Sequence, residues 1–395
     1  MIKYLARFSL LLLLCGCTAE NTVSDEEKYA VVTHYADLAH VIFKDARITA
    51  EAMEQRTEAL LNSPDDTHLQ LARKAWLEAR KPYLQTEVFR LGNPRFDTYH
   101  HRVNGWPTSA QTVEETLRRN SEFTVTSLPN LVPANGDKNT VLTGFHVIEA
   151  LLWGSGDRPV TDFMANHYCT SENKPASADT CEHRRQYLIA ATKLLVEDLN
   201  ALEKQWSADE RGNYRSEFLR QKLPDAYGYI FSGMTSLLLG QLAGPQLKVP
   251  FNTKSLAFAE DNGSANYHNT LEYSVEGIRN VYYGHYTAID DTRYNGTSLK
   301  ALLTRLNPAL QQRLSNAFKN LDSSLGAIHQ AVETNHQPFA QLIATETPER
   351  MPNLQANQLI RDAIDALVLQ AHLIEQAAPL FGANPLTTHT AGFTF

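Results

Sequence analysis

The 395-residue chain has few cysteines and no excess of positive charge. It contains 44 acidic and 36 basic side chains, which give a formal net charge of −8, and no segment is rich in lysine and arginine. Proteins that bind nucleic acid need a positive surface against the phosphates, so this composition argues against a DNA or RNA partner. Beyond the N-terminal segment there is no run of 18 apolar residues, so no transmembrane helix is expected there.

Several common catalytic signatures are also missing. The sequence has no GxSxG nucleophile elbow, no phosphate-binding loop, no dinucleotide-binding glycine pattern, no CxxCH haem attachment site and no EF-hand loop. Any chemistry must therefore come from another arrangement of side chains.

The N-terminus has the pattern of an export signal. A short positive region precedes the apolar run FSLLLLLCGC, which has signal-peptide length and is too short for a stable transmembrane helix. The end of this run resembles a bacterial lipobox. The sequence therefore predicts a signal peptide over residues 1–16, lipidation of Cys17 and a polar tether over residues 17–27, with an ordinary secretory signal as the alternative.

Two cysteines remain in the exported part of the chain. Cys169 and Cys181 enclose a polar stretch of low helix propensity, and an oxidising compartment favours a disulfide between them. Such a bridge would stabilise a surface loop by up to about 3 kcal/mol. A metal site is the alternative, but neither cysteine has a CxxC partner.

Most of the mature chain has helical periodicity, with apolar residues recurring at spacings of three and four. The expected helices cover residues 26–61, 66–91, 181–206, 299–328 and 356–376. Pro308 should interrupt or kink the fourth of these. The sequence therefore predicts an all-α chain.

Two stretches rich in glycine, proline and asparagine separate the earlier helices. Residues 91–110 and 127–139 are predicted to be loops, with His100 and His101 as solvated side chains in the first. A further cluster of glycine and proline near residues 155–182 indicates a boundary. The predicted parts are an N-terminal helical domain, a disulfide loop and a C-terminal helical-bundle domain, over residues 28–160, 161–185 and 186–390.

The segment GFHVIEALLWG places a histidine and a glutamate in an otherwise apolar run. On a helix over residues 139–153, His146, Glu149 and Trp153 share one face. An ionised glutamate buried there costs several kcal/mol unless it is paired, coordinated or protonated. Gly144 leaves room for another backbone or a ligand. From spacing alone, a packed His–Glu core pair and a functional site both remain open.

Two other segments contain chemistry-bearing residues. In YLQTEVFRLGNP, Glu87 and Arg90 lie three positions apart, which is also the spacing of an ordinary surface ion pair. The segment EDNGSANYHNTLEYSVEGIRNVYYGHY contains several carboxylates, His268 and several tyrosines. An amphipathic helix capped by Ser264 or Asn266 is the simpler interpretation of that segment.

Together these segments resemble the imelysin family of bacterial lipoproteins and periplasmic proteins. GFHVIEALLWG is similar to the family's GxHxxE signature and the Leu-Trp-Gly after it, and WLEARKPYLQTEVFRLGNP is similar to its W-x-x-A-R-x-x-Y-x-x-x-E-x-F-R-x-G stretch. VNGWP, LLLGQLAG and GIRNVYYG are similar to three further family segments. The resemblance covers about residues 70–285 by motif.

The resemblance implies a fold and a function. The implied fold has two helical-bundle domains related by a pseudo-twofold axis, with the GxHxxE helix at their interface. Members are associated with bacterial iron acquisition. The implied protein is lipid-anchored on the periplasmic face of the cell envelope, with the outer membrane favoured. It binds a metal ion, with iron preferred over zinc, or a small iron-linked ligand, and its partners are envelope iron-transport proteins.

The predicted site draws on all three segments. The predicted metal ligands are His146, Glu149 and Glu87. The predicted ligand-binding residues are Gly144, Arg90, Trp153, His268 and Asn266. A guanidinium repels a bare cation, so Arg90 favours an anionic ligand or a pair with Glu87. The family's S-D-N-T-H block is altered here, because Ala265 stands in place of its aspartate.

Three hypotheses follow for the function. A binding protein is the main one, with affinity that drops as the pH falls and the histidine becomes protonated. The alternative is a zinc- or iron-dependent metallopeptidase in which the HxxE pair holds the metal and a second glutamate activates water, but no second histidine lies near the motif. The third is an interaction protein for another envelope protein.

Overall fold

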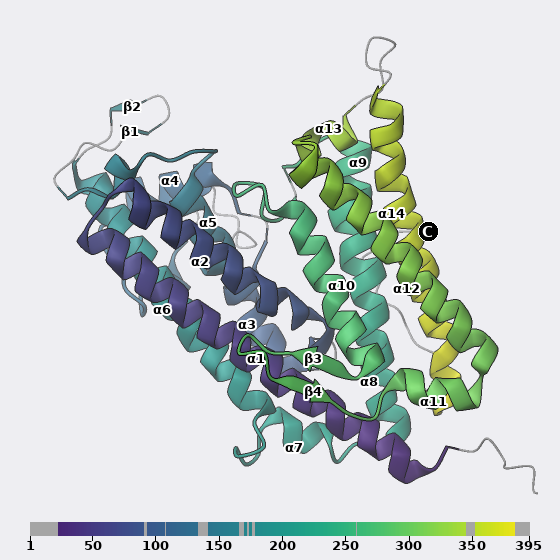
Figure 1. Cartoon of the computed structure of the whole chain (residues 1–395). Helices are drawn as coiled ribbons and strands as arrows, with labels where there is room; N and C mark the ends of the chain where they lie inside the picture. The colour runs from purple at the N-terminus through teal and green to yellow at the C-terminus, as the bar shows by residue number, and fades with distance from the viewer. Residues whose placement is uncertain are drawn as a thin grey trace, which may run out of the picture.

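The computed structural model describes residues 23–90, 93–106, 108–132, 141–165, 170–171, 174–175, 178–257, 259–344 and 352–383. The regular secondary structure of these residues is helical apart from two short pairs of strands (Figure 1), which confirms the predicted all-α class. In the part of the chain that is described, no helix has both the length and the apolarity to span a bilayer. The predicted signal peptide, Cys17 and Cys169 lie outside these ranges, so lipidation and the bridge from Cys169 to the buried Cys181 stay predictions.

Three long helices form the N-terminal half of the molecule (Figure 1). α1 (Asp25–Asn62) packs against both α2 (Asp66–Gln85) and α6 (Ala178–Trp206). The turn between α1 and α2 ends at Asp65, whose carboxylate accepts a hydrogen bond of 2.8 Å from the backbone N–H of His68. Asp65 is therefore the N-cap of α2.

Two short helices form where the sequence predicts a loop. α3 (Pro94–Asn104) and α4 (Ala110–Arg119) occupy most of residues 91–110 and the segment that follows. The side chain of Asn93 accepts hydrogen bonds from the first backbone N–H groups of α3, and Pro94 lies in its first turn. Asparagine followed by proline is a helix start as well as a turn signal, so the loop prediction was wrong.

α5 (Gly144–Trp153) begins later than the predicted helix over residues 139–153. Gly144 has a φ of +82°, and a Cβ atom there would lie 2.3 Å from the carbonyl oxygen of Val103 and 2.4 Å from that of Arg102. The glycine therefore lets the start of α5 lie directly against the end of α3. The group that lies close to Gly144, as the sequence predicts, is the backbone at the end of α3.

The C-terminal half is a second group of helices (Figure 1). These helices are α8 (Leu223–Ser236), α9 (Val249–Thr253), α10 (Tyr267–Tyr283), α11 (Leu299–Leu306), α12 (Pro308–His329), α13 (Phe339–Ile343) and α14 (Pro352–Ala377), whereas the short α7 (Tyr214–Phe218) packs against α6. A π-helix over Leu237–Lys248 joins α8 to α9, and a π-helical turn over Gln330–Thr334 follows α12. Pro308 begins α12 rather than kinking one longer helix, so the predicted interruption is confirmed.

The remaining elements are short. Turns of 3-10 helix cover Glu87–Phe89, Leu128–Asn130, Val160–Phe163 and Ala378–Phe381. The strands β1 (Thr170–Ser171) and β2 (Lys174–Pro175) pair antiparallel, as do β3 (His285–Thr287) and β4 (Arg293–Asn295). In the second hairpin Tyr286 lies opposite Tyr294, and the Tyr286 hydroxyl donates a hydrogen bond of 2.7 Å to Asp45 of α1.

The position of α6 does not match the domain boundaries predicted from the sequence. The sequence places residues 161–185 in a loop and begins the C-terminal domain at residue 186. α6 runs without a break through that position and packs against α1, α3 and α5. Its long apolar face therefore joins it to the N-terminal helices. The pseudo-twofold relation between the two halves stays a prediction.

Gly277 allows α10 to lie against the end of α2. A Cβ atom at Gly277 would lie 2.5 Å from the carbonyl oxygen of Gln85, whereas a Cβ atom at Gly326 of α12 meets nothing within 4 Å. We expect Gly277→Ala to lower the free energy of unfolding by about 1–3 kcal/mol, because the added methyl forces the backbones apart.

Gly326→Ala is the matched control for this prediction. It should raise the free energy of unfolding by up to about 1 kcal/mol, because glycine is unfavourable inside a helix. Urea denaturation of the mature chain without its lipid measures both changes. Equal effects of the two substitutions would contradict the close contact between α10 and α2.

Candidate metal centre

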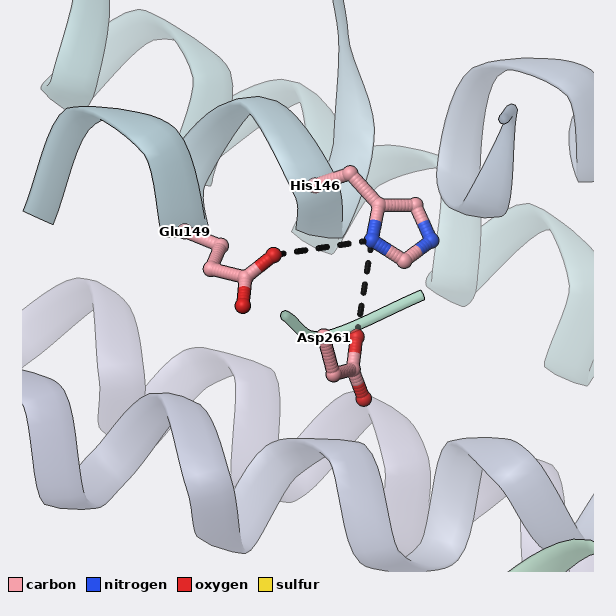
Figure 2. A group of neighbouring side chains, drawn as sticks. All are labelled: His146, Glu149 and Asp261. Carbon is pink, nitrogen blue, oxygen red and sulfur yellow. Dashed lines mark ion pairs between the residues drawn. The ribbon is translucent and has the colours of Figure 1, made fainter. Parts of the chain in front are cut away.

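His146 and Glu149 lie on the same face of α5, as their spacing predicts. Their side chains are buried, and His146 Nδ1 lies 3.8 Å from Glu149 Oε2 (Figure 2). Among the residues that the structure describes, neither ring nitrogen of His146 has a hydrogen-bond partner. The ring of Trp106 covers the imidazole edge to face, with 4.8 Å between the ring centroids. A buried imidazole without hydrogen bonds is costly, so an additional group is expected beside it.

The segment over residues 259–266, just before α10, brings a second carboxylate to His146. Asp261 Oδ1 lies 3.4 Å from His146 Nδ1 (Figure 2), and within the described part of the chain it has no hydrogen-bond partner. In the same segment the backbone N–H and the hydroxyl of Ser264 each donate a hydrogen bond of 2.7 Å to Glu149 Oε1. One oxygen of Glu149 is thus held by the protein, while the other faces the imidazole.

The second oxygen of Asp261 is also held by protein donors. Arg80 Nε donates to Asp261 Oδ2 at 2.8 Å, and the Thr270 hydroxyl donates to the same oxygen at 2.6 Å. Arg80 is fully buried on α2, and its guanidinium also donates to Asn104 at 2.6 Å and to Glu260 at 3.3 Å. These contacts orient the carboxylate so that Oδ1 points at His146, in the way that outer hydrogen bonds orient metal ligands.

The segment that contains Asp261 has an unusual backbone. Asp261 and Ala265 have φ angles of +53° and +58°. Aspartate tolerates this left-handed conformation because its side chain can bond locally, whereas alanine adopts it at a cost of about 1–2 kcal/mol. Backbone strain of this kind concentrates at binding sites, and here it positions Asp261 and Ser264 over α5.

The buried charges of the site do not balance. Glu260 Oε2 lies 3.9 Å from His146 Nε2, on the other side of the imidazole. Burial raises the pKa of Glu260, although His146 and Arg80 nearby oppose the shift. Even with Glu260 protonated, as its burial favours, the carboxylates of Glu149 and Asp261 outnumber the nearby guanidinium of Arg80 and leave an excess of negative charge. A divalent cation would neutralise that excess.

The free atoms have the spacing of metal ligands. One nitrogen of His146 and one oxygen from each of Glu149 and Asp261 all lie within 4.8 Å of one another. Two ligands bound at about 2.1 Å to a tetrahedral ion lie about 3.4 Å apart. The distances of 3.4 and 3.8 Å from Nδ1 to the two oxygens are close to that value. Imidazole and carboxylate ligands suit zinc and iron, so this donor set fits such an ion.

The sequence and the fold of this chain are similar to those of known proteins. The sequence model of one protein family, imelysin, matches residues 39–374. The chain belongs to the imelysin family. Among curated proteins, this imelysin is similar to iron-regulated protein A of Synechococcus elongatus, with 25% identity over 297 residues that cover 72% of this chain and 71% of the relative.

Two solved structures share the imelysin fold. One is named as an iron-regulated protein A precursor from Parabacteroides distasonis, with a TM-score of 0.69, 18% identity, and coverage of 91% of this chain and 96% of that one. The other is an imelysin-like protein from Psychrobacter arcticum, with a TM-score of 0.60, 16% identity, and coverage of 94% and 99%.

Glu87 and Arg90 form a separate group in this imelysin. Glu87 is buried, and its carboxylate lies 3.4 Å from His100 Nδ1 and 3.6 Å from the Arg90 guanidinium. Burial alone would raise the pKa of Glu87, but His100 and Arg90 stabilise its ionised form and lower the pKa to about 2. The structure therefore places Glu87 beside His100 and Arg90 and not among the three candidate ligands at His146. His100 is partly buried, since its ring stacks on Phe96 of α3 and faces Glu87.

The other predicted residues take different positions. Trp153 packs edge to face on Trp76, with centroids 5.3 Å apart, and borders a cavity of about 520 Å³ at the end of α5. His268 contacts Glu333 at 2.7 Å. Asn266 alone touches the candidate centre, because its side-chain amide lies 3.5 Å from Asp261 Oδ2.

Sequence reasoning missed several residues that build the site. Asp261 is the third candidate ligand, and Arg80, Asn104 and Trp106 surround it and His146. Each lies in a segment already singled out: Arg80 in WLEARKPY, Asn104 and Trp106 in VNGWP. Arg80 is also seven positions before Glu87, which is close to two helical turns. The sequence did offer one signal. Glu260 and Asp261 are adjacent carboxylates, and an arginine such as Arg80 on a predicted helix could be expected to pair with them.

Proposed function

We propose that this imelysin is a lipid-anchored protein of the cell envelope that binds a transition-metal ion, preferably iron, in bacterial iron uptake. The observation that supports this proposal best is a pair of buried atoms, His146 Nδ1 and Asp261 Oδ1, which face each other and have no hydrogen-bond partner among the described residues. Protein donors bind the other oxygen of Asp261 and one oxygen of Glu149. The names of two similar proteins, iron-regulated protein A of Synechococcus elongatus and an iron-regulated protein A precursor of Parabacteroides distasonis, support the role in iron physiology.

The depth of the centre favours a metal ion over a larger ligand. His146 is 1% exposed, Glu149 is 4% exposed and Asp261 is fully buried. A single ion can reach such a place through small side-chain movements, whereas haem, a chelate or a peptide needs an open cleft. The same burial argues against a metallopeptidase, because a peptide bond must approach the ion directly. Envelope iron-transport proteins would then be the partners that deliver or receive the ion.

Equilibrium binding measurements test this function. We expect the purified mature chain without its lipid to bind one ferrous, ferric or zinc ion at this centre, and to bind haem far more weakly. Affinity should decrease as the pH falls, because the ligands must be neutral imidazole and ionised carboxylate. If the chain cleaves peptides only when the ion is bound, and His146→Ala abolishes the cleavage, the function is catalysis and not binding. Absence of any ion from the centre would contradict both.

A further inference from the structure

A cavity of about 520 Å³ lies at the C-terminal end of α5. Its walls are one face of α4, Trp153 at the end of α5 and the segment over residues 154–159. Sites for small molecules typically occupy about 300–1,000 Å³, so the cavity has room for a small ligand. The three candidate metal ligands do not line it, so the cavity is separate from the metal centre and does not depend on the proposed function.

The charges on the buried side of the cavity are balanced within the protein. The guanidinium of Arg158 donates hydrogen bonds to Asp162 at 2.8 Å and to Glu114 at 2.6 Å. Arg184 of α6 reaches the same two carboxylates, at 2.8 Å from Glu114 and 3.4 Å from Asp162. Two guanidinium groups therefore share two carboxylates, and this group adds no net charge to the cavity.

Two charges on the exposed side of the cavity are not paired. Asp157 contacts Arg73 at 2.9 Å, but in the described part of the chain Glu115 and Arg118 form no ion pair, either with each other or with another residue. Both line the cavity from α4, where they lie three positions apart on one face. Glu115 accepts a hydrogen bond of 3.1 Å from Gln111, which is neutral. The cavity therefore presents one free positive charge and one free negative charge.

Arg158 adds a donor without a partner. Its side chain lines the cavity and is 8% exposed, and its Nε–H has no acceptor among the residues that the structure describes. A buried N–H without an acceptor is costly, so a ligand oxygen beside it would stabilise the structure. Trp153 is partly buried and supplies an apolar wall to the same cavity. The cavity thus combines two cationic donors, one carboxylate and one indole ring.

We infer that this cavity binds a zwitterionic small molecule of the α-amino-acid class. The carboxylate of the ligand lies between Arg118 and Arg158, because guanidinium groups form strong hydrogen bonds with carboxylates. Its ammonium group faces Glu115, and its apolar side chain packs on Trp153. A simple anion would leave Glu115 without a counterion, and a simple cation would leave Arg118 without one. The competing explanation is a cavity that contains only water.

Isothermal titration of the mature chain without its lipid tests the inference with three related compounds. Phenylalanine carries both charges, 3-phenylpropanoate lacks the ammonium group and phenylalaninamide lacks the carboxylate. We expect phenylalanine to bind about tenfold or more tightly than either of the others, because each of them loses a hydrogen bond between charged groups. Arg118→Gln should weaken the binding of phenylalanine and 3-phenylpropanoate by about tenfold and leave phenylalaninamide unchanged. Glu115→Gln should weaken the binding of phenylalanine and phenylalaninamide without weakening that of 3-phenylpropanoate.

Arg119→Gln provides the matched control, because Arg119 is the next residue of α4, is exposed and lies outside the cavity. It should leave the three affinities unchanged, as should His146→Ala, which alters the metal centre alone. Circular dichroism checks that each variant is folded, and the exposed position of Arg118 makes unfolding unexpected. Failure of phenylalanine to bind, or binding that neither Arg118→Gln nor Glu115→Gln weakens, would overturn the inference and leave a cavity that contains only water.

Discussion

Replacing Arg80 by methionine is expected to lower the free energy of unfolding of the metal-free protein by about 3–5 kcal/mol. Arg80 is fully buried and is the guanidinium that contacts both Asp261 and Glu260. It also lies over the ring of Phe145, at 5.1 Å from its centroid. Removing this charge leaves buried carboxylates without a counterion, whereas methionine keeps much of the apolar volume.

A bound divalent cation should restore part of the free energy of unfolding that Arg80→Met loses. If a divalent cation binds beside Asp261, a saturating concentration stabilises Arg80→Met more than it stabilises the parent, because it supplies the missing positive charge. Arg305→Met is the control, since Arg305 is exposed and its pair with Glu27 is at the surface. That change should cost less than about 1 kcal/mol. An Arg80→Met effect as small as the control would contradict the charge balance described here.

Replacing His146 by alanine is expected to weaken metal binding at the centre by at least about 100-fold. A direct ligand should contribute at least as much as the outer partners of ligands, whose loss costs about 10- to 100-fold. Asp261→Asn should act in the same direction, because it keeps the shape of the side chain and removes its charge. Isothermal titration with ferrous or zinc ions measures both variants against the parent.

A second HxxE pair in the same chain gives a control of identical spacing. His372 and Glu375 lie three positions apart on α14, with Nδ1 and Oε2 3.1 Å from each other, but both side chains are partly exposed. His372→Ala should leave the affinity unchanged, because spacing alone does not make a buried ligand set. Equal losses in His146→Ala and His372→Ala would indicate nonspecific effects and would contradict the assigned centre.

Apolar periodicity predicted the long helices. It did not predict a helix whose first residues also occur in turns. α1, α6 and α14 follow the expected ranges closely, since each has a long apolar face to bury, whereas α2 ends at Gln85, before the expected residue 91. α3 was missed because Asn93 and Pro94 initiate a helix with residues that also occur in turns. α5 begins at Gly144 because the chain must pass the backbone of α3 there, which is a tertiary contact and leaves no periodic pattern.

Two of the three candidate ligands followed from local spacing. His146 and Glu149 share a helix, so their common face could be predicted. Asp261 could not, because it reaches them from a distant segment with left-handed backbone. Glu87 was predicted as a ligand from the resemblance to the family, but α2 ends at Gln85 and the following 3-10 turn directs Glu87 toward His100.

The most direct test of the metal centre is anomalous diffraction from crystals of the mature chain grown with ferrous or zinc ions. The structure predicts a peak at the absorption edge of the added metal, within about 2.0–2.2 Å of His146 Nδ1, Glu149 Oε2 and Asp261 Oδ1. A fully occupied metal elsewhere with no peak among these three atoms, and His146 hydrogen-bonded directly to Asp261, would contradict the account.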